Sequence, residues 1–106
     1  MIYDLIIVGG GISGLSAAMY AGRLNLKTLL FTEMPGGLIT STHIVENWPG
    51  VLSISGPELG MKLYEHAKKS DAEIKNEKVS SIKKTGELFD VATSSGTYQS
   101  KALTIA

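Results

Sequence analysis

The chain has 106 residues, of which 12 are glycine and none is cysteine, and its 10 basic and 10 acidic side chains cancel. That length fits one domain or part of a larger one, and a hydrophobic content of 43% is enough for a buried core. The balanced charge argues against nucleic acid as a partner. Without cysteine, these residues form no disulfide, thiolate metal site or thiol electron relay.

No apolar run approaches the roughly 18 residues that a membrane-spanning helix requires. Residues 5–21 are rich in apolar side chains, but glycines and serines interrupt them and Asp4, with no lysine or arginine, precedes them. A signal peptide has a positively charged start and an unbroken apolar centre, so it is not expected here. His43 and His66 have no further ligands at metal-binding spacing. The sequence therefore predicts a cytoplasmic protein with no membrane partner and no metal.

The first third of the chain predicts a strand, a helix and a second strand. Residues 3–8 end in four consecutive apolar side chains before a glycine, which is typical of a parallel strand buried on both faces. Residues 13–24 carry small and apolar side chains at helical spacing, and Asn25 follows as a left-handed helix stop. Residues 27–32 predict the second buried strand. The unit has the size of a β-α-β crossover.

The remainder predicts a long loop, a second helix and several strands. Residues 34–55 contain prolines, glycines and hydroxyl side chains, and unstructured loops of that length are usually functional or disordered. A helix is expected from Pro57 to about residue 70, with Leu59, Leu63 and Ala67 on its buried face. Residues 73–76 and 79–83 are predicted to form one extended stretch. Residues 88–93 and 97–101 predict a hairpin, and residues 102–106 begin another strand.

Three glycines, Gly9, Gly11 and Gly14, form the pattern G-x-G-x-x-G. The pattern follows a predicted strand, opens a predicted helix, and is followed about 20 residues later by an acid, Glu33, at the end of the second strand. This context makes it a dinucleotide-binding signature: the glycines permit the tight turn, the close approach of a pyrophosphate and the packing of helix on strand.

The chemistry of this turn favours a phosphate group beside a ribose. The helix start at Ile12 and Ser13 presents free N–H groups and a partial positive charge to phosphate oxygens. Glu33 accepts hydrogen bonds from a ribose 2′-hydroxyl and repels a 2′-phosphate, so FAD or NAD is expected rather than NADP. The glycine pattern alone does not choose between FAD and NAD, and the alternative is a glycine-rich turn that binds nothing.

The loop after the second strand offers groups that suit a flavin. Gly36 and Gly37 expose their backbone, and the amide of Asn47 can pair with the alternating donors and acceptors of a flavin ring. Trp48 is interpreted as a side chain that packs the loop onto the core, as buried aromatic residues usually do.

At this point the sequence resembles the amino-terminal part of a thioredoxin-reductase-type flavoprotein over nearly its whole length. The resemblance rests on residues 4–11 (D-L-I-I-V-G-G-G), on the glycine pair, on residues 45–50 (V-E-N-W-P-G) and on residues 56–59 (G-P-E-L). It implies a Rossmann-like FAD-binding fold, in which a parallel sheet with helices is joined by an antiparallel β crossover layer.

The resemblance also implies a set of FAD-binding residues. The glycine turn would hold the pyrophosphate and Glu33 the adenosine ribose, while Gly36, Gly37 and Leu38 would pass close to the cofactor. Asn47 would contact the isoalloxazine ring, and Val79 would meet the adenine through its backbone. Ala106 would open an Ala-Thr-Gly turn over the FAD. Relatives commonly have glutamine at the position of Leu38, so a side-chain hydrogen bond from there is not expected.

For the complete protein, the resemblance implies an NADPH-dependent disulfide oxidoreductase that forms a homodimer and reduces a thioredoxin-like partner. We expect residues 1–106 to be the amino-terminal portion of the FAD domain, with the NADPH domain and its Cys-x-x-Cys pair absent, so that this segment alone is inactive. No residue of the segment is assigned a catalytic role.

Three alternatives remain at the level of the sequence. The chain could be a stand-alone dinucleotide-binding module without catalysis, or an NAD-dependent dehydrogenase domain, although the loop at residues 46–50 argues against the latter. It could also belong to a cysteine-free flavoprotein resembling ferredoxin–NADP reductases.

Overall fold

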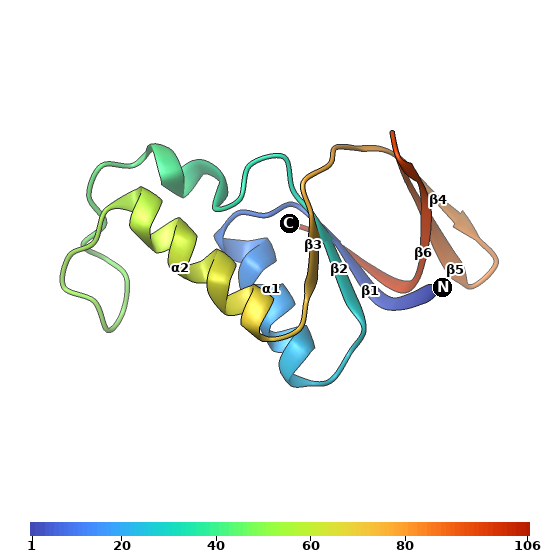
Figure 1. Ribbon diagram of the computed structural model, residues 1–106, viewed down its shortest axis with the longest axis horizontal. Coiled ribbons are helices and arrows are strands. Elements are labelled where there is room, and N and C mark those ends of the chain that lie inside the picture. The colour runs from blue at the N-terminus through green and yellow to red at the C-terminus, as the bar shows by residue number, and fades with distance from the viewer.

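The computed structural model describes all 106 residues as two helices packed on one strongly twisted sheet (Figure 1). The sheet has six strands in the order β3-β2-β1-β6-β5-β4. The elements in chain order are β1 (Ile2–Val8), α1 (Ile12–Arg23), β2 (Thr28–Phe31), the 3-10 helix η1 (Gly37–Ser41), α2 (Gly56–Lys69), β3 (Glu73–Lys75), β4 (Val79–Thr85), β5 (Leu88–Thr93) and β6 (Gly96–Ile105).

The predicted β-α-β unit is confirmed. β1 pairs in parallel with β2, and all four residues of β2 are buried, as expected for a strand that is covered on both faces. Ile7 and Leu30 contact the helices, whereas Ile6 and Leu29 face the opposite side of the sheet. Asn25 follows α1 with φ 61°, the left-handed conformation predicted for the helix stop.

The two helices form one layer. Leu15 and Ala18 of α1 and Ala67 of α2 pack with Ile7 and Leu30 in one buried cluster. α2 begins at Gly56, one residue before the predicted start at Pro57, because the Ser55 side chain caps it by accepting a hydrogen bond from the backbone N–H of Glu58.

The antiparallel strands cover the other face of the parallel strands, so the molecule has three layers. Val91 of β5 and Tyr98 of β6 pack against residues of β1 and β2. The rings of Tyr98 and Phe31 meet edge to face with their centroids 5.2 Å apart. β6 joins the layers, because it pairs with β5 in antiparallel and with β1 in parallel orientation.

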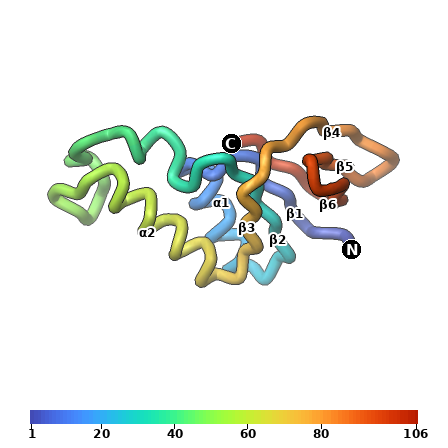
Figure 2. Tube along the Cα trace, turned by 45° about the horizontal axis from the view of Figure 1, so that its top comes forward, coloured from blue at the N-terminus to red at the C-terminus, as the bar shows by residue number.

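Two details of the strand predictions are wrong. The segments expected to be one extended stretch are separate strands: β3 pairs with β2 at one edge of the sheet, while β4 pairs with β5 at the opposite edge. Residues 76–78 connect the two strands, and Figure 2 shows them as the part of the tube that leads from β3 to β4. Residues 97–101 and 102–106 are not separate strands either, because β6 runs from Gly96 to Ile105 without a break.

The long loop is more ordered than its composition predicts. Residues 37–41 form the 3-10 helix η1, and Val45 and Ile54 form an isolated antiparallel bridge. Trp48 packs against the small cluster of Val45, Ile54 and Leu59, which confirms its interpretation as a packing residue. The loop is therefore held on α2 by apolar contacts.

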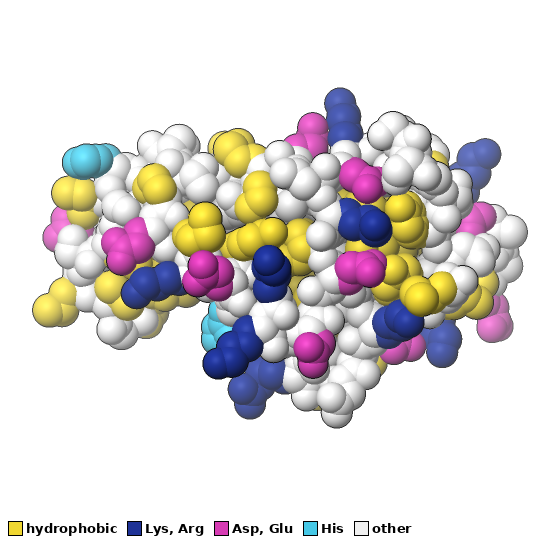
Figure 3. Space-filling model, in the orientation of Figure 1, with side chains coloured by type: hydrophobic (Ala, Val, Ile, Leu, Met, Phe, Trp, Pro, Cys, Tyr) yellow, Lys and Arg dark blue, Asp and Glu magenta, His cyan; other side chains and the backbone are white.

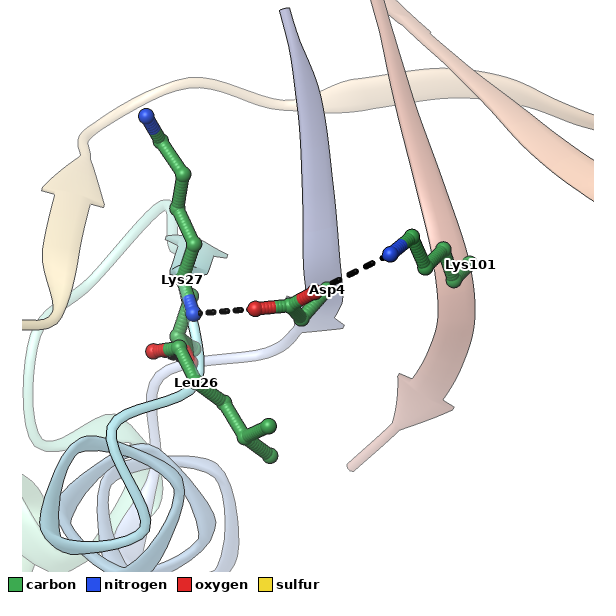
Figure 4. A network of polar contacts seen from close by, with 5 residues as sticks. Asp4, Leu26, Lys27 and Lys101 are labelled. Atoms are coloured by element: carbon green, nitrogen blue, oxygen red, sulfur yellow. Dashed lines mark hydrogen bonds and ion pairs between the residues drawn. The ribbon is translucent and has the colours of Figure 1, made fainter.

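Asp4 of β1 contacts both the residue just before β2 and a residue of β6, away from the carboxyl ends of β1 and β2 (Figure 4). Asp4 Oδ2 accepts a hydrogen bond of 2.7 Å from the backbone N–H of Lys27, and Asp4 Oδ1 lies 3.6 Å from Lys101 Nζ. The Lys101 side chain is 68% exposed, so this ion pair contributes less than about 1 kcal/mol to stability.

The 10 basic and 10 acidic side chains leave the chain with no net charge, and neither helix has the length and apolar character needed to cross a bilayer. Acidic and basic side chains are interspersed over the face shown in Figure 3. No group of three or more histidine, cysteine, aspartate or glutamate side chains is placed to hold a metal ion.

The buried Tyr3 makes stability depend on alkaline pH. Burial, the hydrogen bond to the Glu73 carboxylate and the charge of that carboxylate together raise the pKa of its phenol from 10.0 to about 12, with burial the largest cause. Because the folded chain holds this proton more tightly than the unfolded chain, its stabilising effect is complete below pH 10 and is lost between pH 10 and 12. We expect Tyr3→Phe to flatten the fall of Tm across that interval, measured by circular dichroism. An equally steep fall in the variant would contradict this.

Candidate dinucleotide-binding site

The glycine turn, residues 9–14, lies at the carboxyl end of β1, where the chain leaves the sheet and enters α1 (Figure 1). A Cβ built on Gly9 would lie 2.4 Å from the carbonyl oxygen of Ala106. A Cβ built on Gly14 would lie 1.8 Å from the carbonyl oxygen of Gly9. These two glycines therefore allow backbone to pack on backbone at the end of the parallel strands. The N–H of Ala106 donates to the carbonyl of Val8 over 2.9 Å, which holds the last residue beside the turn.

Gly11 differs from its two neighbours in the pattern. Its φ of −79° suits any residue, and the nearest atoms to an added Cβ are Gly37 Cα at 3.8 Å and the Gly36 carbonyl oxygen at 4.0 Å. The chain itself thus leaves room for a side chain at position 11. The space beside Gly11 belongs to a cleft, as expected where a ligand approaches the backbone.

The amino terminus of α1 is open for an anion. Gly11 is its N-cap and provides no side-chain cap, and the first turn contains no acid. The N–H groups of Ser13 and Gly14 donate to no group of the chain. The start of α2 is different: the Ser55 side chain accepts a hydrogen bond from one of its free N–H groups, and the negative charge of Glu58 offsets the positive end of the helix dipole. Free N–H groups and the helix dipole at α1 make a phosphate-binding position.

The glycine pair packs directly on the glycine turn. Gly36 N–H donates to the Gly10 carbonyl over 2.8 Å, and an added Cβ on Gly37 would lie 2.7 Å from Gly11 Cα. Both residues have positive φ, 89° and 63°, which favours glycine at these positions. The start of η1 is thereby fixed against the turn.

Two clefts lie beside the glycine turn. The larger has a volume of about 520 Å³ and is lined by Gly11, Ile12, Ser13, Gly14, Gly36, Gly37, Leu38, Ile39, Thr42 and Ala106. The smaller has a volume of about 90 Å³ and is lined by Val8, Gly9, Phe31, Thr32, Glu33, Glu77, Lys78 and Val79. Together they contain every site residue expected from the sequence except Asn47.

Asn47 is exposed in the long loop and lines neither cleft, so its contact with a flavin stays a prediction. Two residues of the larger cleft, Ile39 and Thr42, were not predicted as site residues, because they lie in and directly after the unpredicted η1. Glu77 and Lys78 were not predicted either, because their place beside the end of β2 depends on the crossing from β3 to β4.

The fold and these clefts define a Rossmann-type dinucleotide-binding architecture: a parallel β-α-β unit, a glycine turn at the start of the helix, and an acid after the second strand. A family model described as pyridine nucleotide-disulphide oxidoreductase matches residues 3–106. The chain belongs to that family.

Individual relatives agree with this assignment. Thioredoxin reductase of Bacillus subtilis is 43% identical over 106 residues, which are 99% of this chain and 34% of the relative. The crystal structure of thioredoxin reductase from Streptococcus pyogenes superposes with a TM-score of 0.94 at 39% identity, covering 98% of this chain and 34% of that one. The crystal structure of a ferredoxin-flavin thioredoxin reductase from Clostridium acetobutylicum superposes with a TM-score of 0.91 at 35% identity, covering 99% of this chain and 37% of that one. The chain therefore spans about a third of the length of these relatives.

Proposed function

We propose that this chain binds FAD as part of a thioredoxin-reductase-like flavoprotein. The observation that carries the proposal is the open amino terminus of α1 beside Gly11, where free N–H groups face a cleft that a side chain would narrow. The family match and the identity to thioredoxin reductases support FAD over NAD.

The chain's own residues fit a long dinucleotide. The pyrophosphate would be held at the turn by the N–H groups of Ser13 and Gly14, with the adenosine half in the smaller cleft and the flavin half in the larger. FAD, once bound, supplies the hydride and electron transfer that no side chain of this segment performs. The protein contributes binding, orientation and the exclusion of water on one side of the cofactor.

Glu33 is proposed to accept a hydrogen bond from the adenosine ribose. It is exposed and lines the smaller cleft. The chain bend around it is held by the Thr32 hydroxyl, which accepts a hydrogen bond from the backbone N–H of Met34. A carboxylate in this position favours a free 2′-hydroxyl over a 2′-phosphate.

Glu33→Ala is expected to weaken ADP binding by about tenfold, because a hydrogen bond to a charged acceptor is worth about 1.5 kcal/mol or more. Isothermal titration of ADP into parent and variant measures this loss. The parent should also bind ADP in preference to its 2′-phosphorylated analogue, and the variant should lose part of that preference. Unchanged ADP affinity and an unchanged preference would show that Glu33 is a solvated strand end.

For the complete protein we propose electron transfer from NADPH through FAD to a cysteine pair and then to a thioredoxin-like protein. The proposal includes a homodimer in the cytoplasm, with residues 1–106 as the amino-terminal portion of the FAD domain. It is supported by the thioredoxin reductases that align with 99% or 98% of this chain.

A ferredoxin-linked flavoprotein is the second candidate, supported by the similarity to the ferredoxin-flavin thioredoxin reductase. The electron donor separates the two candidates. Reduction of the flavin in the complete protein by NADPH, followed in an absorbance spectrum, supports the first candidate. Reduction by reduced ferredoxin and not by NADPH supports the second.

A further inference from the structure

The linker of residues 76–78 carries the chain from one edge of the sheet to the other and borders the smaller cleft on the way (Figures 1 and 2). That cleft is lined by Glu77, Lys78 and the first residue of β4, Val79, together with Glu33. A crossing of three residues has no ladder of strand hydrogen bonds to fix it, so its position depends on side chains.

Glu77 attaches the linker to the hairpin between β5 and β6. Its Oε1 accepts one hydrogen bond from the Thr93 hydroxyl and one from the Ser95 hydroxyl, each 2.7 Å long. Thr93 is buried, and the backbone N–H of Ser95 donates to its hydroxyl, so both donors are themselves held in place. These hydrogen bonds favour the charged carboxylate and lower the pKa of Glu77 below its ordinary value.

Asn76 attaches the same linker to the end of β2. In the amide orientation that satisfies both neighbours, its side-chain nitrogen donates to the carbonyl oxygens of Thr32 at 2.8 Å and Glu33 at 3.1 Å. Two consecutive side chains therefore tie the linker, one to the end of β2 beside the smaller cleft and the other to the hairpin between β5 and β6.

We propose that Glu77 is a positioning residue for the adenosine half of the cofactor. It holds Lys78 and Val79 at a fixed distance from Glu33 by anchoring the linker to Thr93 and Ser95. The inference rests on the proposed function, since it assigns the smaller cleft to adenosine. It differs from a purely structural role in one respect: loss of the anchor should affect the adenosine half and spare the phosphate position at α1.

The test compares ADP with inorganic pyrophosphate in the 106-residue chain, by amide chemical shifts of residues 11–14 during titration. We expect Glu77→Ala to weaken ADP binding about three- to tenfold, because charge-assisted hydrogen bonds no longer order the linker, and to leave pyrophosphate binding within about twofold. Glu77→Gln keeps an acceptor oxygen and should restore most of the ADP affinity. Glu87→Ala, which removes an exposed acid with no hydrogen bond in the turn before β5, is the matched control.

Ser95→Ala removes one of the two hydroxyl donors to Glu77 and should cause a smaller loss of ADP affinity, again without weakening pyrophosphate binding. It tests the same anchor if Glu77→Ala folds poorly. Equal weakening of ADP and pyrophosphate, or unchanged ADP affinity in both variants, would overturn the positioning role. A parent chain that binds neither ADP nor FAD would overturn the proposed function, and the inference with it.

Discussion

Gly11→Val is expected to abolish FAD and ADP binding while leaving the chain folded. The backbone at residue 11 has an ordinary φ, and an added Cβ meets no chain atom closer than 3.8 Å. The side chain therefore enters the larger cleft at the amino terminus of α1, where the pyrophosphate must approach the backbone. We expect the affinity for either ligand to fall by at least about 100-fold, which corresponds to about 2.7 kcal/mol of binding free energy.

The measurement is isothermal titration of ADP and FAD, with far-ultraviolet circular dichroism and Tm recorded on the same samples. Gly11→Ala is the milder companion variant and should bind with intermediate affinity, because its side chain ends at the Cβ. A Gly11→Val variant that folds and binds as tightly as the parent would show that the phosphate position lies elsewhere.

Gly14→Ala is expected to have the opposite result, because it destabilises the fold itself and does not act only on the ligand site. A Cβ on residue 14 would lie 1.8 Å from the carbonyl oxygen of Gly9 and 2.9 Å from its carbonyl carbon. Both are backbone atoms at the end of β1, so the overlap is relieved only by moving α1 away from the strand. That displacement breaks the buried cluster around Leu15, Ala18 and Ile7.

Overpacking of a core usually costs up to about 3 kcal/mol, and the upper end is expected here because the overlap is with backbone; that cost lowers Tm by about 12 °C or more in a domain of this size. Thermal unfolding followed by circular dichroism measures it directly. Gly11→Ala is the matched control, since it adds the same methyl group three residues earlier without a backbone overlap. If the two variants have the same Tm, the close packing of α1 on the end of β1 is described wrongly.

These two glycines illustrate what the sequence could predict about the site. The G-x-G-x-x-G spacing after a buried strand was enough to place the turn, the helix start and Glu33, because all of them follow from contacts within one β-α-β unit. The same motif assigned the close approach of a ligand to Gly11 and the packing of the helix on the strand to Gly14; Gly11 borders the larger cleft, and a Cβ on Gly14 would meet the Gly9 carbonyl oxygen. The spacing alone could not indicate that Ala106 and the glycine pair at 36–37 pack on the turn from distant parts of the chain.

The strands after α2 show where a pattern within the sequence is not sufficient. β3 has three residues and β4 follows after another three, so their composition reads as one extended segment. Each of them joins the strand that offers a free edge, β2 in one case and β5 in the other, and this is a choice between partners distant in sequence. For the same reason, Glu77 could not be predicted as part of the smaller cleft.

Whether FAD occupies both clefts across the glycine turn is tested by an NMR titration of the isotopically labelled chain with FAD. We expect shifts of the amide signals of Gly11, Ser13 and Gly14 at the turn, of Val79 in the smaller cleft and of Leu38 in the larger. ADP should reproduce the changes at the turn and at Val79 and leave Leu38 unchanged. Saturating FAD that shifts none of these signals, or that shifts only residues outside the two clefts, would show that the cofactor does not bind across the glycine turn.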